Sequence, residues 1–283
     1  MRKPRRLPPE ELAPYVWEMP RAPTRRPAAD GPGEPQAPAR GSSEAHPLAQ
    51  ENPVAQENPV ACAPGSPEPR PIDWQHLFGN AHPVEVEVGM GKGLFLLTQA
   101  ASRPDTNFFG VEIVRKYQLY AATRYAIRKL PNVKTACADA KVLLRDFVPA
   151  GSVAAVHVYF PDPWWKKRHK KRRVFTPEFA ADAARVLRPG GRLHLATDVE
   201  EYFGVMTGIV RAMPAFRELG AETSTAPVEE AGYQTNFERK ARLKGTPVWR
   251  AVFERTAAAV TVAADPAEET GEPRRKPGVG WSG

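Results

Sequence analysis

The 283-residue chain has a formal net charge of +8, which favours polyanionic partners but does not specify a fold. It contains no run of about 18 apolar residues, so no membrane span is expected. Its Arg- and Pro-rich start lacks the apolar stretch of a signal peptide, so no secretory signal is expected and a cytoplasmic location is favoured. Two cysteines, Cys62 and Cys137, are too few for a disulfide framework or a cysteine metal site, and no metal is expected.

The first 70 residues differ in composition from the rest of the chain. They hold 16 of the 31 prolines and show no helical or alternating apolar periodicity, so apolar burial cannot offset the entropy of ordering them. A tandem duplication, "AQENPV" twice over residues 49–60, is typical of low-complexity sequence. We therefore predict a disordered tail over residues 1–70, in which only "PYVWEMP" (residues 14–20) is apolar enough to dock. The folded domain is expected over residues 71–257, and a flexible tail over residues 258–283.

From Pro83 onward, short apolar stretches alternate with helix-length segments, which is the pattern of a parallel sheet covered on both faces. Strands are predicted, in chain order, for "PVEVEVG", "NFFGVEI", "VKTACAD", "SVAAVHVYF", "RLHLATD" and "PVWRAVFER". Helices are predicted for "GLFLLTQAASR", "VRKYQLYAATRYAIRKL", "TPEFAADAARV" with its Thr N-cap and Pro-Gly-Gly stop, and residues 199–213. A less regular segment precedes the last strand. This alternation predicts a doubly wound α/β domain, whose site forms outside the carboxyl ends of the strands.

Acidic residues stand at the end of each of the first five predicted strands. In chain order they are Glu87, Glu112, Asp139, Asp162 and Asp198. The first is followed by the turn "GMGKG", whose Gly-x-Gly-x-Gly spacing differs from that of dinucleotide-binding and triphosphate-binding loops. Because an acid just before the turn would repel a pyrophosphate, Glu87 suits a ligand with a cationic or ammonium group.

The next two acids complete the outline of a ligand. Glu112 can accept hydrogen bonds from ribose hydroxyls, and Asp139 can accept from an adenine amino group. Together these residues describe a nucleoside with an amine and no phosphate, which S-adenosylmethionine matches better than NAD does. The alternative for Glu87 and Asp139 is that they only cap helix N-termini.

The stretch "PDPWWKKRHKKRR" (residues 161–173) follows the fourth predicted strand. Its two prolines hold Asp162 in a stiff turn, and Trp164 and Trp165 offer flat surfaces of the kind that stack on bases. A band of phosphate-contacting side chains is predicted for Lys166, Lys167, Arg168, Lys170, Lys171, Arg172 and Arg173. A solvated charge run or a nuclear-localisation-like patch would explain the cations but not the turn before them. The stretch therefore favours a nucleic-acid partner.

The chain resembles the bacterial tRNA (guanine-N7)-methyltransferases over residues 71–255. The motifs that carry the resemblance are "EVGMGKG", "FFGVEI", "ADAKVL", "YFPDPWWKKRHKKRR", "LRPGGRLHLATD" and "TNFERKARLKGTPVWRAVFER". It implies a Rossmann-like class I methyltransferase fold, with a mostly parallel seven-stranded sheet and helices on both faces. It also implies S-adenosyl-L-methionine as cofactor, tRNA as partner without a membrane or an obligatory protein partner, and action as a monomer or homodimer.

The resemblance assigns roles at matching positions. The implied donor-binding residues are Glu87, Gly89, Gly91, Glu112, Asp139, Ala140 and Asp162, and Asp162 is also the implied catalytic residue. The implied tRNA-binding residues are Lys166, Asp198, Thr235, Asn236, Phe237 and Glu238. The chain departs from the family where Asn236 replaces a lysine, where Lys240-Ala241 replaces Arg-Gly, and where the Pro-rich first 70 residues replace a basic segment.

The reaction implied is methylation of a guanine in the tRNA variable loop. Guanine N7 has a lone pair and no proton, so we expect an in-line displacement without a general base, aided by alignment and by Asp162 as an electrostatic and orienting group. The alternatives are a methyltransferase acting on an exocyclic amine, a non-catalytic RNA-binding protein and an NAD-dependent dehydrogenase. Two further polar residues are expected to be structural, namely His157 in the core and Cys137 in strand packing.

Overall fold

The computed structural model describes residues 7–20, 71–165, 167–224 and 235–262, and in them eight strands form one sheet. Its order is β1-β4-β3-β2-β5-β6-β8-β7, with β8 antiparallel to both β6 and β7 and every other neighbouring pair parallel. The strands are β1 (Val16–Trp17), β2 (Val84–Val88), β3 (Asn107–Glu112), β4 (Val133–Cys137), β5 (Val153–Tyr159), β6 (Leu187–Thr197), β7 (Phe216–Ser224) and β8 (Val248–Arg255). The strand order reverses between β2 and β5, which is where ligands bind in such sheets.

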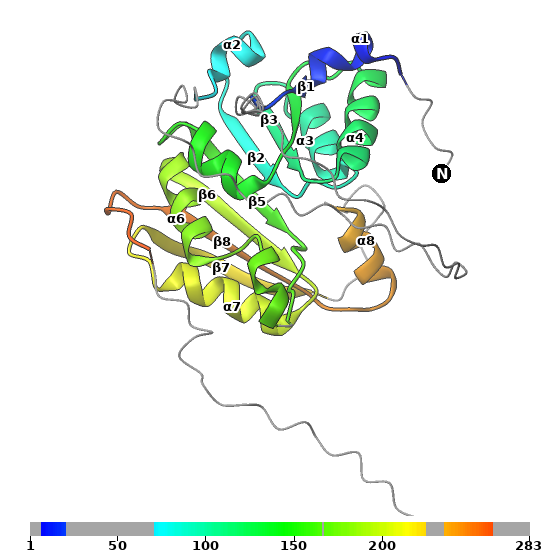
Figure 1. Cartoon of the computed structure of the whole chain (residues 1–283). Helices are drawn as coiled ribbons and strands as arrows, with labels where there is room; N and C mark the ends of the chain where they lie inside the picture. The colour runs from blue at the N-terminus through cyan, green and yellow to red at the C-terminus, as the bar shows by residue number, and fades with distance from the viewer. Residues whose placement is uncertain (1–6, 21–70, 166, 225–234, 263–283) are drawn as a thin grey trace, which may run out of the picture. The chain divides into compact units, whose positions relative to one another are not determined.

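Helices cover both faces of this sheet (Figure 1). The described helices are α1 (Pro9–Leu12), α2 (Trp74–Phe78), α3 (Leu94–Ser102), α4 (Arg115–Ile127), α5 (Ala140–Val142), α6 (Pro177–Val186), α7 (Glu200–Arg211) and α8 (Asn236–Leu243), with short helical turns η1 (Ala13–Tyr15), η2 (Leu143–Phe147) and η3 (Lys167–Arg172). Buried side chains of α3 and α4 pack with Phe108 on one face of the sheet. Those of α6 and α7 pack with Val156 and Leu195 on the other. The predicted doubly wound α/β fold is therefore confirmed.

The eighth strand is the main departure from the predicted sheet. β1 adds to the outer edge of β4, with Val16 opposite Thr135 and Trp17 opposite Ala136. Trp17 packs its ring edge-on against Phe109 at 6.1 Å between centroids. The strand lies inside "PYVWEMP", the part of the N-terminal segment that was expected to be able to dock. Residues 21–70 and 263–283, which include Cys62 and the "AQENPV" duplication, lie outside the described residues.

The segment around β6 and β7 also differs from its prediction. Thr176 caps α6 by accepting a hydrogen bond from the Phe179 backbone N–H at 3.2 Å. However, the Pro-Gly-Gly that follows the helix lies within β6, where an irregularity lets Leu187 pair with Val153 before Arg192 pairs with Ala155. The less regular segment contains β7, which pairs with β8 along its whole length. Among the described residues, no helix is long and apolar enough to cross a bilayer.

Candidate functional site

The carboxyl ends of β2, β3, β4 and β5 meet at one edge of the sheet. Val88 stands opposite both Val111 and Val158, and Glu112 stands opposite Cys137. The acidic residues at these strand ends, predicted from sequence as parts of a site, are therefore brought to the same edge of the molecule. The residues between β2 and α3 form the turn at its centre.

The glycine turn requires glycine for two different reasons. Gly89 and Gly91 have φ angles of 71° and 53°, and no atom lies within 4 Å of the position that a Cβ would take, so backbone conformation alone selects glycine there. Gly93 has a φ of 66°, and a Cβ on it would stand 1.9 Å from the Tyr125 hydroxyl oxygen. That hydroxyl donates to the Gly93 carbonyl at 3.1 Å. The turn is thus fastened to α4 on one side and open on the other.

Glu112 ties the glycine turn to β3. Its Oε2 accepts a hydrogen bond from the Gly91 N–H at 2.9 Å, and its Oε1 accepts one from the Val114 N–H at 2.9 Å. The carboxylate is buried, and these two backbone donors use one lone pair on each oxygen. Glu112 therefore organises the turn, while each oxygen keeps a lone pair that a ribose hydroxyl can reach.

Glu87 is the unusual group of the site. Its side chain is buried, and among the described residues its Oε2 has no hydrogen-bond partner. Burial, and then the nearby charge of Glu112, raise the pKa of Glu87 well above its usual range. A buried carboxyl without a donor is costly, and a cationic ligand would remove that cost. Within the described ranges no hydrogen bond of Glu87 caps a helix, so the capping alternative does not explain this residue.

Asp139 fits the capping alternative. It is the N-cap of α5, and its Oδ1 accepts from the Lys141 N–H at 2.9 Å. The carboxylate is only partly buried at the end of β4, and the neighbouring Ala140 is buried. This cap holds Asp139 at the edge of the site without using its second oxygen.

Asp162 stands exposed on the turn after β5. Two non-glycine residues near it, Phe160 and Trp164, have positive φ angles of 52° and 41°. Such angles cost free energy and persist only where surrounding contacts hold them, which is a feature of functional turns. The Phe160 N–H donates to the Ala196 carbonyl at 2.7 Å, which ties the start of the turn to β6.

Arg173 braces this turn from the far end of the basic run. It is buried, its Nε donates to the Pro163 carbonyl at 2.6 Å, and its guanidinium lies over the rings of Trp165 and Tyr202 at 5.2 and 5.7 Å from their centroids. This geometry gives Arg173 a structural role in the turn, and the phosphate contact predicted for it stays a prediction. Arg172, by contrast, is exposed beside the Trp164 ring at 5.2 Å.

The remaining basic residues lie around η3, which replaces the predicted loop. Arg168 is exposed, and its Nε lies 3.1 Å from His169 Nε2. Lys166 lies outside the described residues. Lys167, Lys170 and Lys171 lie in η3, and their side chains are outside the described part. Trp165 is 45% exposed, which leaves part of its ring free for contact.

Helix α8 brings the "TNFE" segment to the Asp162 turn. The exposed ring of Phe237 stacks on Phe160 with centroids 6.1 Å apart and an angle of 20° between the planes. Thr235 caps the helix by accepting from the Glu238 N–H at 3.0 Å, and Asn236 is partly buried beside it. Asp198 is exposed at the end of β6. Of these groups, Phe237 contacts the turn after β5 directly, and the tRNA contacts implied for the segment stay a prediction.

Glu238 serves the structure of this region. It is 1% exposed, and its Oε1 forms ion pairs with Arg242 at 2.9 Å and with Arg250 at 2.6 Å. This network fastens α8 to β8 and gives Glu238 a structural role, and the tRNA contact that the resemblance implied for it stays a prediction. Sequence reasoning missed the network because only the spacing of four to Arg242 is a local signal; Arg250 lies on a separate strand.

Comparisons with known proteins agree with this arrangement. The family model described as "Putative methyltransferase" matches residues 81–251. The tRNA (guanine-N(7)-)-methyltransferase of Rhodopirellula baltica is 44% identical over 66% of this chain and 71% of its own length. That of Streptomyces coelicolor is 40% identical over 66% of this chain and 69% of its own length.

Solved structures extend the likeness to the fold. The 16S rRNA methyltransferase KamB matches 68% of this chain and 96% of its own with a TM-score of 0.52 and 19% identity. At that identity the likeness concerns the fold alone. The relatives, the family model and the sheet order together place the protein: the chain belongs to the family of tRNA (guanine-N(7)-)-methyltransferases.

Proposed function

We propose that the protein transfers a methyl group from S-adenosyl-L-methionine to N7 of a guanine in the variable loop of tRNA. The observation that carries the proposal is the buried, unpartnered carboxyl of Glu87 beside a glycine turn that is open to a ligand. Family membership supplies the reaction, and this carboxyl supplies a reason in this chain for a cationic donor.

The residues present fit S-adenosylmethionine. Its cationic amino acid portion would satisfy Glu87, and its adenosine portion carries no phosphate to be repelled there. Gly89 and Gly91 present bare backbone to the ligand, and Glu112 keeps acceptor capacity for the ribose hydroxyls. Asp139 has a second oxygen for the adenine amino group. When bound, the donor supplies an electrophilic methyl group on its sulfonium.

On the acceptor side, this chain has to align a base and not to deprotonate it. Guanine N7 has an in-plane lone pair, so Asp162 is proposed to accept hydrogen bonds from the guanine N1–H or amino group and to stabilise the positive charge that methylation leaves on the ring. The strained turn between Phe160 and Trp164 keeps its carboxylate exposed and fixed. Alignment of this kind contributes up to roughly 7–11 kcal/mol in favourable intramolecular reactions.

The tRNA is proposed to lie over the turn and η3. Arg168 and Arg172 are exposed there for phosphate contact, and the free part of the Trp165 ring can stack on a base. Phe237 and Asp198 border the same surface. A variable-loop guanine is normally paired in the folded tRNA, so exposing it costs a few kcal/mol, which these contacts would offset.

The decisive experiment is methyl transfer from labelled S-adenosylmethionine to an unmodified tRNA transcript, followed by reduction and aniline cleavage. We expect one cut, in the variable loop, because that chemistry cleaves at N7-methylguanosine. The isosteric variant Asp162→Asn should lower kcat by roughly 100- to 1,000-fold, as expected for loss of one electrostatic group at the reacting centre. Asp105→Asn, an exposed acid before β3 at the opposite edge of the sheet, is the matched control.

Donor binding is measured separately by calorimetry. Glu87→Gln should weaken S-adenosylmethionine by roughly 10- to 100-fold, the effect of about 1.5–3 kcal/mol for one charged hydrogen bond. Methyl incorporation without aniline cleavage would move the target off N7 to another atom of the RNA. Tight tRNA binding without incorporation would refute the catalytic proposal.

A further inference from the structure

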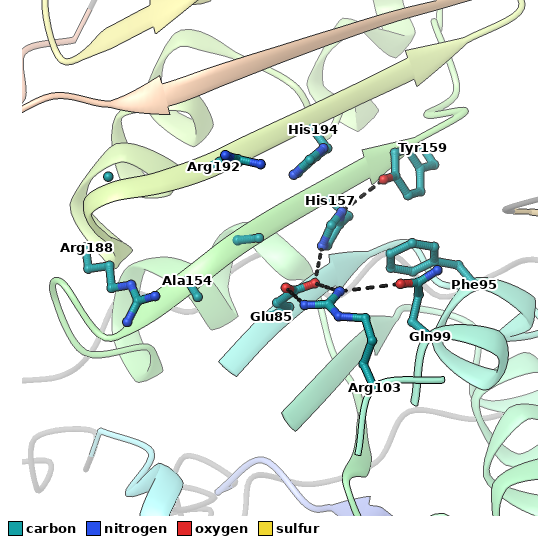
Figure 2. Close-up of a pocket in the computed structure, with 12 residues that line it drawn as sticks. Glu85, Phe95, Gln99, Arg103, Ala154, His157, Tyr159, Arg188, Arg192 and His194 are labelled. Atoms are coloured by element: carbon teal, nitrogen blue, oxygen red, sulfur yellow. Dashed lines mark hydrogen bonds and ion pairs between the residues drawn. The ribbon is translucent and has the colours of Figure 1, made fainter. Parts of the chain in front are cut away.

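A cavity of about 530 Å³ lies on the face of the sheet above β5 and β6, beside α3 (Figure 2). None of the residues assigned above to the donor or to the target guanine lines it. It adjoins a second cavity of about 480 Å³ over β6, β8 and β7, and the two share Tyr159, Arg192 and His194. Together they form an elongated depression, which we call the sheet-face groove.

A chain of hydrogen bonds runs along the floor of the first cavity. His157 lies 2.9 Å from the Tyr159 hydroxyl through Nδ1 and 3.0 Å from Glu85 through Nε2. Both carboxylate oxygens of Glu85 also bond the guanidinium of Arg103, one of them at 3.1 Å. Figure 2 shows His157, Glu85 and Arg103 pointing toward one another. Glu85, the acid that lines the first cavity, is thus paired within the protein, and the second cavity is lined by one further acid, the exposed Glu222.

Two arginines of the groove have no such partner. Arg188 and Arg192 line the cavity from the two sides of the irregularity in β6, and both are exposed. Within the described part of the chain, neither makes an ion pair or a side-chain hydrogen bond. Burial, and then the charge of His157, lower the pKa of the adjacent His194 to about 3, so this ring adds no compensating or further charge at neutral pH. The first cavity is therefore lined by two arginines that no acidic side chain of the described residues pairs with.

Surplus like charges that face one cavity repel one another, and a polyanion relieves that repulsion. Two exposed guanidinium groups without an acidic partner suit a chain of phosphates better than an apolar ligand. Arg192 lies five residues before Thr197 on β6, so it stands about 17 Å from the strand end that borders the Asp162 turn. A folded RNA bound at that turn can extend over this distance.

We propose that Arg188 and Arg192 bind the phosphate backbone of the tRNA substrate at a second contact, away from the nucleotide that is methylated. The inference rests on the proposed function for the identity of the RNA. It assigns the groove to binding and to no chemical step. The contact would set the orientation of the tRNA on the enzyme without reading its sequence.

The expected effect follows from counterion release. Each phosphate contact contributes about 0.7–0.9 to the slope of log affinity against log salt, so losing two should make the slope shallower by about 1.4–1.8. At about 0.15 M salt this corresponds to roughly 10- to 30-fold weaker tRNA binding. The turnover number at saturating tRNA should not change, because neither arginine approaches the reacting atoms.

The test compares the full chain with Arg188→Gln/Arg192→Gln and with a matched control, Arg128→Gln/Lys129→Gln. The control removes two exposed cations at the end of α4, outside the groove. Fluorescence anisotropy with labelled tRNA at several salt concentrations gives affinity and slope. Methyl transfer gives kcat and the KM for tRNA, and calorimetry with S-adenosylmethionine confirms that the donor site is intact.

The groove variant should show a raised KM for tRNA, a shallower salt slope and an unchanged kcat, while the control stays within about twofold of the parent. Equal behaviour of the two variants would overturn the proposal. Altered binding of inorganic phosphate with unaltered tRNA affinity would also overturn it, by assigning the groove to a small anion. If the parent chain binds tRNA through these arginines yet transfers no methyl group, the groove assignment stands and the proposed function fails.

Discussion

Replacing Glu238 by glutamine tests whether this residue holds the fold or the substrate. Its carboxylate is 1% exposed and bridges two arginines whose side chains are only 7% and 14% exposed. The substitution removes the negative charge and leaves two largely buried guanidinium groups without it. Glutamine keeps one acceptor oxygen of similar position, so shape is nearly conserved and the charge is the main change.

The expected loss in the free energy of unfolding is about 3 kcal/mol. Removing one partner of a buried ion pair costs about 3–5 kcal/mol, and the remaining amide oxygen places this variant at the lower end. For a domain of this size, that corresponds to a fall in melting temperature of roughly 6–12 °C. The free energy of unfolding of natural domains is about 5–15 kcal/mol, so a loss of this size is readily measured.

Urea unfolding at neutral pH, combined with hydrogen exchange of the α8 amides, gives the answer. Glu178→Gln, an exposed glutamate on α6, is the isosteric control and should change stability by less than about 0.5 kcal/mol. The structural assignment is refuted if Glu238→Gln keeps the stability and α8 protection of the parent but loses affinity for tRNA. That outcome would return Glu238 to the substrate surface.

Three further substitutions separate other parts of the fold and site. Burial alone would raise the pKa of Glu85, but its histidine and arginine partners outweigh burial and lower the pKa to about 2. Glu85→Gln should therefore lower the free energy of unfolding by roughly 3 kcal/mol at pH 7. That cost should fade between about pH 4.5 and pH 2 in acid-unfolding curves, and a pH-independent cost would contradict this assignment. The Cβ added by Gly93→Ala would meet the Tyr125 hydroxyl, so this variant should destabilise the protein by about 2–5 kcal/mol. Gly89→Ala has no such clash and should cost about 1–2 kcal/mol, and thermal unfolding measures both. Arg173→Met removes the bond to the Pro163 carbonyl, so it should lower kcat by roughly 10- to 100-fold and leave donor affinity in calorimetry unchanged. Equal losses in kcat and in donor affinity would mean that Arg173 supports the whole domain.

The grouping of acids at one edge of the sheet could be predicted from the sequence because its signals are local. A buried strand, an acid and a glycine turn follow one another within ten residues at Glu87, and the rule that parallel strands end at one edge brings Glu112 and Asp139 beside it. The structure adds what each acid does. Glu112 holds the turn, Asp139 caps a helix, and Glu87 alone remains without a donor.

The parts that could not be predicted depend on contacts between distant segments. β1 is two residues long, too short for any periodicity, and it forms because Trp17 finds Phe109 and Phe147 at the sheet edge. Arg173 ends a run of cations that look alike in sequence, and only the fold buries it under Tyr202. A charge run cannot reveal which of its members turns inward.

The acceptor half of the site depends on that second kind of contact. The turn bearing Asp162 contains two non-glycine residues with positive φ angles, each costing of order 1–3 kcal/mol. Besides the Phe160 N–H bond to Ala196, two side-chain contacts from outside the turn offset that cost: Arg173 at the Pro163 carbonyl, and Phe237 on the ring of Phe160. Because neither contact involves the glycine turn, substitutions in α8 or at the end of η3 should misplace the base and spare the donor. The sequence departures around Asn236 fall on this half, so we expect them to change the alignment of the tRNA and to leave cofactor binding unchanged.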